Sequence, residues 1–318
     1  MFTLLLPSSF KPIRSWCNAL NVALCLFVFV PLPVLADNFR VLLVLSDSSA
    51  PYQSFAKTFA ENLPATLPVA VLEHAEEFTG NVPKSDLIVT VGVKASSLVA
   101  PKTNTPLLAA MLPKSSYEDL LGKQRHGKDM SAIYLDQPWE RQADFLHILL
   151  PGRNKIGLLY SSLTRLDLAE LHKEIARHDS ILNAQLLSAS DSLFDALEAL
   201  LDNSDVLLAV PDHVIYSSNN IRNILLTTYR RGVPLIGLSQ SYVNAGALGA
   251  IFSTPEQIAA QASAIVMTFS RSHQLPDAQY PILFTIAVNQ EVARTLSVPI
   301  QSPEMVRLQM DDVKRKMR

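Results

Sequence analysis

Short apolar runs alternate along this chain with segments whose apolar residues recur at helical spacing, and no other feature restricts the possible fold as strongly. Such alternation is typical of parallel sheets whose strands are joined by helices that cover both faces. In the first half, the sequence predicts a helix over residues 51–63 and strands over 39–45, 69–72, 86–91, 106–111 and 131–135. The chain is therefore predicted to have an α/β fold.

The same pattern starts again after Gln137-Pro138. Strands are predicted over residues 155–160, 181–187, 205–210, 233–238 and 246–253, with helices over 139–150, 164–178, 190–201 and 218–231. Thr254 can cap a further helix, because Pro255 suits its first turn and Gln257 lies three residues after the cap. We expect that helix to run to about residue 272. A strand over 281–288, a short helix over 290–296 and a polar tail over 301–318, frayed or helical, complete the prediction.

The first 36 residues are typical of a secretion signal. Lys11 and Arg14 form a positive start, residues 22–30 form an apolar core, and Val34-Leu35-Ala36 suits a cleavage site after Ala36. The apolar stretch is shorter than the ~20 residues that span a bilayer, which makes an uncleaved anchor the weaker interpretation. We therefore expect a periplasmic protein that begins at Asp37.

Removal of this signal changes the composition in two useful ways. The full chain carries 27 Lys and Arg against 29 Asp and Glu, and the signal contains two of the cations, so the remaining chain has a formal charge of −4. That balance argues against a broad nucleic-acid surface. Both cysteines, Cys17 and Cys25, lie in the signal. A mature chain without cysteine has no disulfide, cysteine-based zinc site, iron–sulfur cluster or cysteine nucleophile.

The remaining residues, roughly 280, exceed the ~100–200 of an ordinary domain. Two similar α/β halves explain this length better than one large sheet. No Gly- or Ser-rich linker separates the halves, and the join at residues 136–138 is brief. The sequence therefore predicts two lobes that meet at a hinge.

Ligands of open parallel sheets bind outside the carboxyl ends of the strands. Polar residues and helix starts follow several predicted strands here, and the candidate ligand-binding residues are Ser46, Asp47, Gly92, Val93, Lys94, Tyr160, Ser161, Asp212, Ser239, Gln240 and Tyr242. Free N–H groups at the helix starts would suit an anionic group of a small molecule. The alternative is that each polar side chain only caps a helix.

Four of these candidates have specific alternatives. Lys94 could pair with a ligand carboxylate or remain solvated. Asp212 could accept a hydrogen bond from a ligand ammonium group or cap the next helix. Tyr242, like Tyr160, could stack on a ring or line the interface between the lobes.

Catalytic and nucleotide-binding motifs are absent from the sequence. There is no GxSxG, HExxH, GxGxxG or GxxxxGK[ST], and the seven histidines show no metal-ligand spacing. We therefore expect no catalytic residue, no metal site and no cofactor. A hydrolase is the least supported of the possible functions.

Four passages resemble the ABC transporter substrate-binding protein family that includes tryptophan- and tyrosine-binding proteins of bacteria. DLIVTVG at residues 86–92 is similar to a family strand and loop, and LLPGRNKIGLLY at 149–160 is similar to the entry into the second lobe. The stretch from Val233-Pro234 to Gly246-Ala247-Leu248 and the segment 284–296 follow two later family patterns. The order and spacing of the four passages carry the resemblance.

The resemblance implies a type I periplasmic binding protein fold, with two Rossmann-like lobes, parallel sheets and a three-segment hinge. Lobe I would comprise residues 37–135 plus 254–280, and lobe II residues 136–253 plus 281–300, with a polar tail over 301–318. The chain would cross between the lobes near residues 135–138, 253–254 and 279–284. A ligand would be enclosed between the lobes by hinge closure.

The family resemblance and the two-lobe pattern together predict a periplasmic solute-binding protein, with no enzymatic activity. It would capture an amino acid or other small organic solute and deliver it to an ABC permease in the inner membrane. Three positions depart from the family pattern: Gly92-Val93-Lys94, Asp212-His213-Val214 and Ser239-Gln240. These changes motivate an alternative function, a periplasmic sensory or interaction module that serves an outer-membrane receptor or signalling partner.

Overall fold

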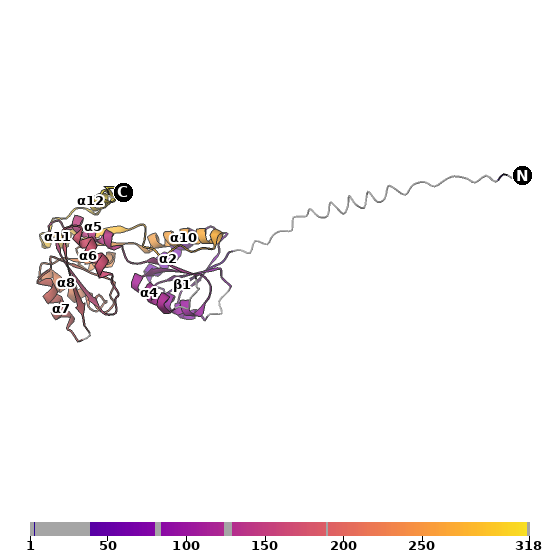
Figure 1. Cartoon of the computed structure of the whole chain (residues 1–318), viewed down its shortest axis with the longest axis horizontal. Coiled ribbons are helices and arrows are strands. Elements are labelled where there is room, and N and C mark those ends of the chain that lie inside the picture. Colours follow the sequence, from indigo (N-terminus) through magenta and orange to yellow (C-terminus); the bar gives the residue numbers. More distant parts are fainter. Residues whose placement is uncertain (1–2, 4–38, 80–83, 124–128, 189, 317–318) are drawn as a thin grey trace. The chain divides into compact units, whose positions relative to one another are not determined.

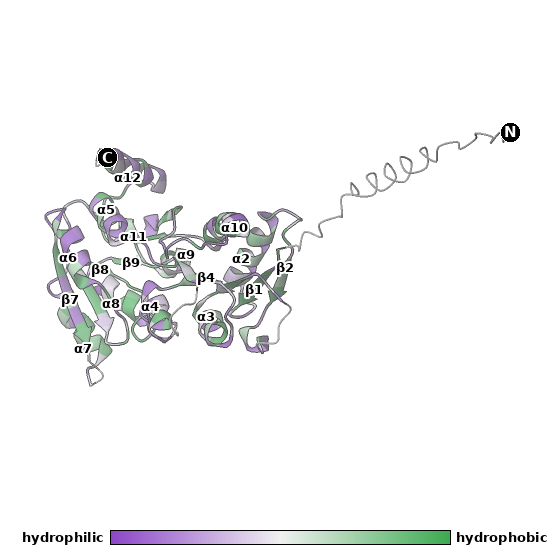
Figure 2. Cartoon of the chain, turned by 45° about the vertical axis from the view of Figure 1, so that its right-hand side comes forward, coloured by the Kyte–Doolittle hydropathy of each residue, from purple (hydrophilic) through white to green (hydrophobic). Residues whose placement is uncertain are grey.

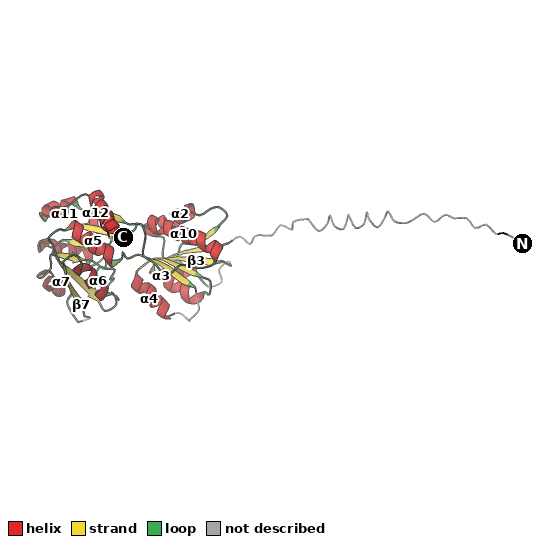
Figure 3. Ribbon diagram, turned by 45° about the horizontal axis from the view of Figure 1, so that its top comes forward, coloured by secondary structure: helices red, strands yellow, loops and turns green. Residues whose placement is uncertain are grey.

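The computed structural model describes residues 3, 39–79, 84–123, 129–188 and 190–316 of the 318-residue chain. The predicted signal over residues 1–36 and its cleavage site lie outside the described residues, apart from residue 3. The described chain forms two sheets covered by helices, which Figure 3 shows as yellow strands between red helices. This arrangement is the α/β fold predicted from the alternating pattern.

The first sheet has five parallel strands in the order β2-β1-β3-β4-β5. Its strands are β1 (Val41–Leu45), β2 (Val69–Leu72), β3 (Leu87–Val91), β4 (Leu107–Leu112) and β5 (Met130–Tyr134). The associated helices are α2 (Ala50–Glu61), η2 (Ala75–Glu77), α3 (Val93–Val99), η3 (Ala100–Lys102), α4 (Lys114–Lys123) and α10 (Pro255–Ser272). β1 and β3 are buried along their whole length, which explains why their residues are apolar except for the buried Thr90.

The second sheet has six strands in the order β11-β10-β9-β8-β6-β7. Its strands are β6 (Lys155–Ser161), β7 (Ile181–Leu187), β8 (Val206–Leu208), β9 (Leu235–Gly237), β10 (Gly249–Phe252) and β11 (Thr285–Val288). The associated helices are α5 (Trp139–Leu149), α6 (Leu168–Ala176), α7 (Leu193–Leu201), α8 (Ile221–Arg230), α9 (Gln240–Ala245), α11 (Gln290–Thr295) and α12 (Pro303–Lys316).

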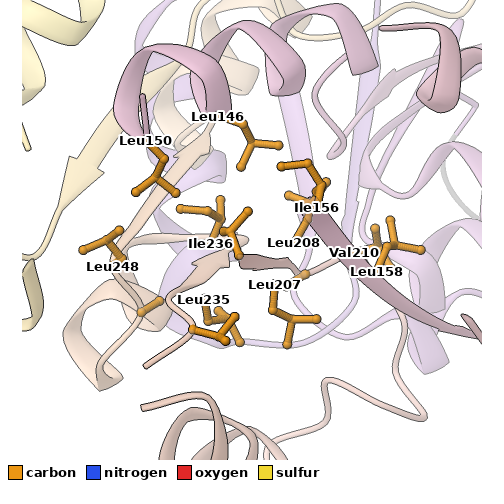
Figure 4. Packing of buried hydrophobic residues seen from close by; sticks show 14 of the residues in the cluster. Leu146, Leu150, Ile156, Leu158, Leu207, Leu208, Val210, Leu235, Ile236 and Leu248 are labelled. Carbon is orange, nitrogen blue, oxygen red and sulfur yellow. The ribbon is translucent and has the colours of Figure 1, made fainter. Parts of the chain in front are cut away.

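Each sheet has its own hydrophobic core, and the hydrophobic colouring of the strands in Figure 2 follows these cores. In the second sheet, Leu146 and Leu150 at the end of α5 face Ile156, Leu208 and Ile236 on the strands (Figure 4). Because these apolar side chains are removed from water, they hold helix and sheet together.

Helix α10 follows β10 of the second sheet but packs against α2 over the first sheet (Figure 1). Its start is a capping box: the Thr254 side chain accepts from the Gln257 N–H, and the Gln257 side chain accepts from the Thr254 N–H. This confirms the helix start predicted from the sequence. The chain thus passes between the two sheets after β5, before α10 and before β11.

Two predictions about the last strand are wrong. The strand begins at Thr285, not at Pro281, because Pro281 has no N–H and the N–H of Ile282 donates to Gln261 Oε1 instead of to a strand. β11 also pairs with β10 in antiparallel direction, so the second sheet is mixed. Parallel neighbouring strands are usually joined by a helix that packs on their own sheet. The helix between β10 and β11 is α10, which packs on the other sheet, so β11 can pair with β10 in antiparallel direction.

The polar segment that begins at Gln301 contains α12, whose Val306 and Met310 are buried in the core of the second sheet. These two residues are four apart and therefore share one face of the helix. The helix packs against α5. Among the described residues, no helix is long and apolar enough to cross a membrane.

Candidate functional site

The predicted site residues of the first sheet are held mainly by contacts within that sheet. The Ser46 hydroxyl donates to the carbonyl oxygen of Val91 at 2.8 Å and accepts from the N–H of Ala95 at 3.1 Å. It is buried, and it joins the end of β1 to the end of β3 and the start of α3. The Asp47 carboxylate accepts from the N–H of Ser49 at 2.9 Å, and the hydrogen bonds from Ser49 lower the pKa of Asp47.

Gly92 is required by packing. Its φ is +90°, and a Cβ at this position would lie 2.5 Å from the Ser46 hydroxyl oxygen and 2.6 Å from the Tyr52 hydroxyl oxygen. Val93 is exposed, and the exposed Lys94 pairs with Glu76 of η2. Because the Lys94 ammonium lowers the pKa of Glu76, this lysine already has a carboxylate partner within the protein.

The predicted residues of the second sheet are also tied to their own lobe. Tyr160 is half-buried against the core, and Ser161 is buried. Asp212 is 2% exposed, and its carboxylate accepts backbone hydrogen bonds from Ser161, Val214 and Ile215. Asp212 therefore holds the turn that follows it and does not cap the next helix, since α8 begins at Ile221 with Asn220 as its N-cap. Burial opposes its ionisation, yet the hydrogen bonds from Ser161 and Ile215 lower the pKa of Asp212 below its usual range.

The other three residues lie around α9. Ser239 occupies the N-cap position of α9, where its side chain makes no capping hydrogen bond. The Gln240 side chain donates to Asn244 one turn later at 2.9 Å, and the Tyr242 hydroxyl donates to the carbonyl oxygen of Tyr216 at 3.0 Å. The partly buried Tyr242 therefore packs within the second lobe.

A pocket of ≈ 270 Å³ lies at the carboxyl ends of strands from both sheets. It is lined by Lys114, Ser115, Glu118, Asp136, Gln137, Trp139, Thr164, Arg165, Leu166, Asp167, Pro211 and Tyr280. These residues follow β4 and β5 of the first sheet and β6 and β8 of the second, or lie where the chain crosses between the sheets. None of the eleven predicted site residues, all of which the structure describes, belongs to this lining.

Asp136 gives the pocket a carboxylate held in a fixed position. Its Oδ2 accepts from the N–H of Lys114 at 2.6 Å, which links the end of β5 to the start of α4. Burial raises the pKa of Asp136 above its usual range, although the Lys114 N–H acts in the opposite direction. A half-buried carboxylate of this kind gains from a cationic partner.

Aromatic rings and cations complete the lining. Trp139 begins α5, and the ring of Tyr280 packs edge-on against Tyr134 with 5.2 Å between the centres. Burial raises the pKa of Tyr280 to about 12, so its hydroxyl keeps its proton at neutral pH. The Lys114 ammonium lies 5.8 Å from the centre of that ring, and Arg165 of the second lobe pairs with Asp119 of α4 at 3.4 Å. The pocket thus offers both charges beside flat apolar surfaces.

These lining residues are not among the predicted site residues, although they too follow predicted strands. Asp136-Gln137 directly follows the predicted strand 131–135, and Lys114-Ser115 comes shortly after the predicted strand 106–111. Both pairs are polar residues after a predicted strand and could have been predicted as site residues by the same rule. The sequence instead suggested only that residues 136–138 join the two halves. In the part of the chain that the structure describes, no cluster of three or more His, Cys, Asp or Glu side chains is arranged to hold a metal ion.

Solved structures with the same fold come from several bacteria. The structure described as the ABC domain in complex with L-Trp from Streptococcus pneumonia is 14% identical, with a TM-score of 0.62 over 86% of this chain and 98% of that one. A conserved domain protein from Vibrio cholerae is 20% identical, with a TM-score of 0.62 over 86% and 98%. A ligand-free, open substrate-binding protein with adhesive properties from Clostridium difficile is 14% identical, with a TM-score of 0.64 over 84% and 97%.

At these identities the likeness shows the fold, which is that of type I periplasmic binding proteins, as the sequence predicted. No curated protein matches the chain at a significant level. The model of the family described as ABC transporter substrate binding protein matches residues 68–313, well over half of the chain. The match includes the strands from β2 to β11, every residue of the pocket lining and the four passages that carry the resemblance. The chain therefore belongs to the ABC transporter substrate-binding protein family, whose members bind solutes.

Proposed function

We propose that this protein captures a small organic solute in the ≈ 270 Å³ pocket and performs no covalent chemistry on it. The observation that carries the proposal is that the carboxyl ends of strands from both sheets line one pocket. In α/β folds, ligands bind outside the carboxyl ends of the strands. A solute that contacts both lobes stabilises the state in which they close on it, because those contacts are lost when the lobes separate.

The lining favours an amino acid or a similar solute that carries both charges. Asp136 would accept hydrogen bonds from an ammonium group, and Lys114 or Arg165 would pair with a carboxylate. Trp139 and Tyr280 would stack on an apolar or aromatic side chain. The related Streptococcus structure, described as a complex with L-Trp, supports this ligand class.

The second part of the proposal is delivery to an ABC permease in the inner membrane from the periplasm. Family membership supports the transporter partner, and the signal predicted over residues 1–36 supports export. Mass spectrometry of the chain recovered from the periplasm should find an N-terminus at Asp37. A mass that includes residues 1–36 would contradict a cleaved signal.

A thermal-shift screen against amino acids, purines and small organic acids tests the binding proposal, with calorimetric titration of each hit. Asp136→Asn should weaken binding by about tenfold or more, because it removes the charge that pairs with the ammonium group. Trp139→Ala should also weaken binding, through lost stacking. Lys94→Ala is the matched control, since Lys94 pairs with Glu76 outside the pocket and should leave affinity unchanged.

Two results would overturn the proposal. If no solute of the panel binds, capture of a small solute by this pocket is wrong. If Lys94→Ala abolishes binding while Asp136→Asn does not, the ligand binds at the end of β3 and not in this pocket. Cross-linking in whole cells tests the partner: a permease among the products supports delivery, whereas a receptor or kinase alone supports the sensory alternative.

A further inference from the structure

The three segments that cross between the sheets are joined to one another by side-chain hydrogen bonds. We refer to residues 135–138, 253–254 and 279–284 as the first, second and third crossover. The Gln137 amide Nε2 donates to the Ser253 hydroxyl at 3.0 Å, and that hydroxyl donates to the carbonyl oxygen of Leu283 at 2.6 Å. One serine hydroxyl therefore receives a bond from the first crossover and gives one to the third.

The two side chains that form the first of these bonds are buried. Gln137 and Ser253 are each 5% exposed. A hydroxyl has a single proton to donate, so the bond from Ser253 to Leu283 uses its whole donor capacity. Breaking such a bond in a buried site leaves polar groups without compensation from solvent, which costs more than the loss of an exposed bond.

Arg141 of α5 extends the network from the side of the second lobe. Its guanidinium donates to Gln137 Oε1 of the first crossover and to the carbonyl oxygen of Pro281 in the third, the latter at 3.0 Å. Its Cζ lies 4.5 Å from the centre of the Phe284 ring, and Cζ of Arg307 on α12 lies 3.8 Å from the same centre. Burial, with the nearby Arg307 charge, lowers the pKa of Arg141 to about 10, so the guanidinium remains charged at neutral pH.

Helix α10 holds the same crossovers from the side of the first lobe. Gln261 donates to the carbonyl oxygen of Tyr280 at 3.3 Å and accepts from the N–H of Ile282 at 2.9 Å. Gln257 accepts from the N–H of Thr254 at 3.0 Å. Side chains from one helix of each lobe thus form hydrogen bonds with the crossovers. The crossovers are therefore linked to one another and to both lobes.

We propose that Gln137, Arg141 and Ser253 form a hinge clamp that makes the three crossovers move as one unit when the lobes close. These three are positioning residues: they act on the relative movement of the lobes. The backbone of one crossover cannot rotate alone without breaking a hydrogen bond to another crossover. Solute capture would then follow one concerted bending motion, and the clamp would set how readily the protein reaches its closed state. The inference rests on the proposed function only in this last step.

Hydrogen–deuterium exchange of the chain without any solute tests the clamp directly. Ser253→Ala removes the relay, and its matched control is Ser263→Ala, which removes an equally buried hydroxyl that bonds only within the first lobe, to Ala259 and Phe59. We expect Ser253→Ala to raise exchange about tenfold at amides of all three crossovers, with β1 to β5 unaffected. Ser263→Ala should leave exchange in the crossovers unchanged.

The clamp is wrong if exchange in Ser253→Ala rises only beside residue 253, rises throughout the protein, or does not rise. Arg141→Lys is a second variant for the case that Ser253→Ala does not fold. It keeps the charge but cannot make both bonds with one planar group, so exchange should rise in the first and third crossovers. Because all these measurements omit solute, failure of every ligand screen would leave the clamp standing, and normal exchange in Ser253→Ala would refute the clamp alone.

Discussion

Oδ2 of Asp212 accepts a hydrogen bond of 2.7 Å from the backbone N–H of Ser161, and this bond ties the loop after β8 to the end of β6. The other carboxylate oxygen accepts from the N–H groups of Val214 and Ile215 at 2.9 and 3.1 Å. A single buried carboxylate therefore satisfies three backbone donors. The sequence suggested Asp212 as a ligand contact or a helix cap, whereas in the structure it joins the carboxyl ends of two interior strands of the second sheet.

Replacement of Asp212 should destabilise the protein strongly. Asp212→Ala leaves three N–H groups without their acceptor, which should lower the free energy of unfolding by about 2–4 kcal/mol in urea denaturation. The matched control is Asp205→Ala, which also removes a carboxylate that accepts two backbone N–H bonds, from Asn154 and Lys155, but at the surface. Water can replace that acceptor, so the control should lose less. Equal losses would contradict the role given to burial.

The same residue predicts a pH dependence. The pKa of Asp212 is lowered in the folded state, so its ionised form contributes stability above the usual carboxyl pKa of ~3.9. That contribution is lost as the pH falls through the lowered pKa of the folded state. Asp212→Asn should flatten this part of the acid unfolding profile, measured by circular dichroism. An unchanged profile would show that other carboxyl groups govern acid stability.

Gly92 and Gly152 separate backbone strain from steric clash. Both have positive φ, +90° and +84°, but a Cβ on Gly152 would meet no atom within 4 Å. Gly152→Ala should therefore cost only the backbone strain, about 1–2 kcal/mol. Gly92→Ala adds a clash with Ser46 and Tyr52 and should cost about 2–4 kcal/mol in total. Thermal unfolding of the two variants side by side measures the difference; similar losses would mean that Ser46 and Tyr52 move aside freely.

Asp136 should give stability the opposite pH dependence from Asp212. Burial raises its pKa in the folded state, so the folded protein holds this proton more tightly than the unfolded chain does. Its favourable contribution is complete below the usual pKa of ~3.9 and is lost as the pH rises through the raised value. Without solute, Asp136→Asn should gain melting temperature relative to the native chain as the pH rises, and the two should converge in acid. A difference that is constant with pH would contradict this prediction.

Lys94→Ala should change little. The pair with Glu76 joins two exposed side chains, and such surface pairs contribute about 0–1 kcal/mol. We expect a change in the free energy of unfolding within about 0.5 kcal/mol, measured by urea denaturation. A larger loss would show that this pair is needed to keep η2 against α3.

Local sequence signals predicted the elements well, because they depend on neighbouring residues. The Thr254-Pro255-Gln257 start of α10 forms the capping box that its spacing predicts. The buried strands β1 and β3 appear as apolar runs, interrupted only by Thr90 in β3. The strand predicted over 281–288 is wrong in its first half, because the partner of the Ile282 N–H, Gln261, lies 21 residues earlier on α10. The apolar Ile282 and Leu283 suggested burial, yet both are exposed.

The candidate site was less predictable for a related reason. Polar residues follow several of the strands, so the sequence offers many equivalent candidates. Ser46 and Asp212 satisfy backbone groups of their own lobe, whereas Asp136 and Trp139 line the pocket. Which ends meet depends on strand order: β4 and β5 lie together at one edge of the first sheet, and this order is not visible in a list of strands.

The sequence by itself determined that the chain alternates strands and helices in two halves, because hydrophobic period and capping act over a few residues. Only the tertiary structure decided that Gln137 meets Ser253 across 116 residues of sequence, and that Asp136 opens into a pocket while Asp212 does not. Such contacts arise when buried surfaces bring distant segments together. A polar side chain then bonds whichever group lies within reach, and sequence spacing does not specify that group.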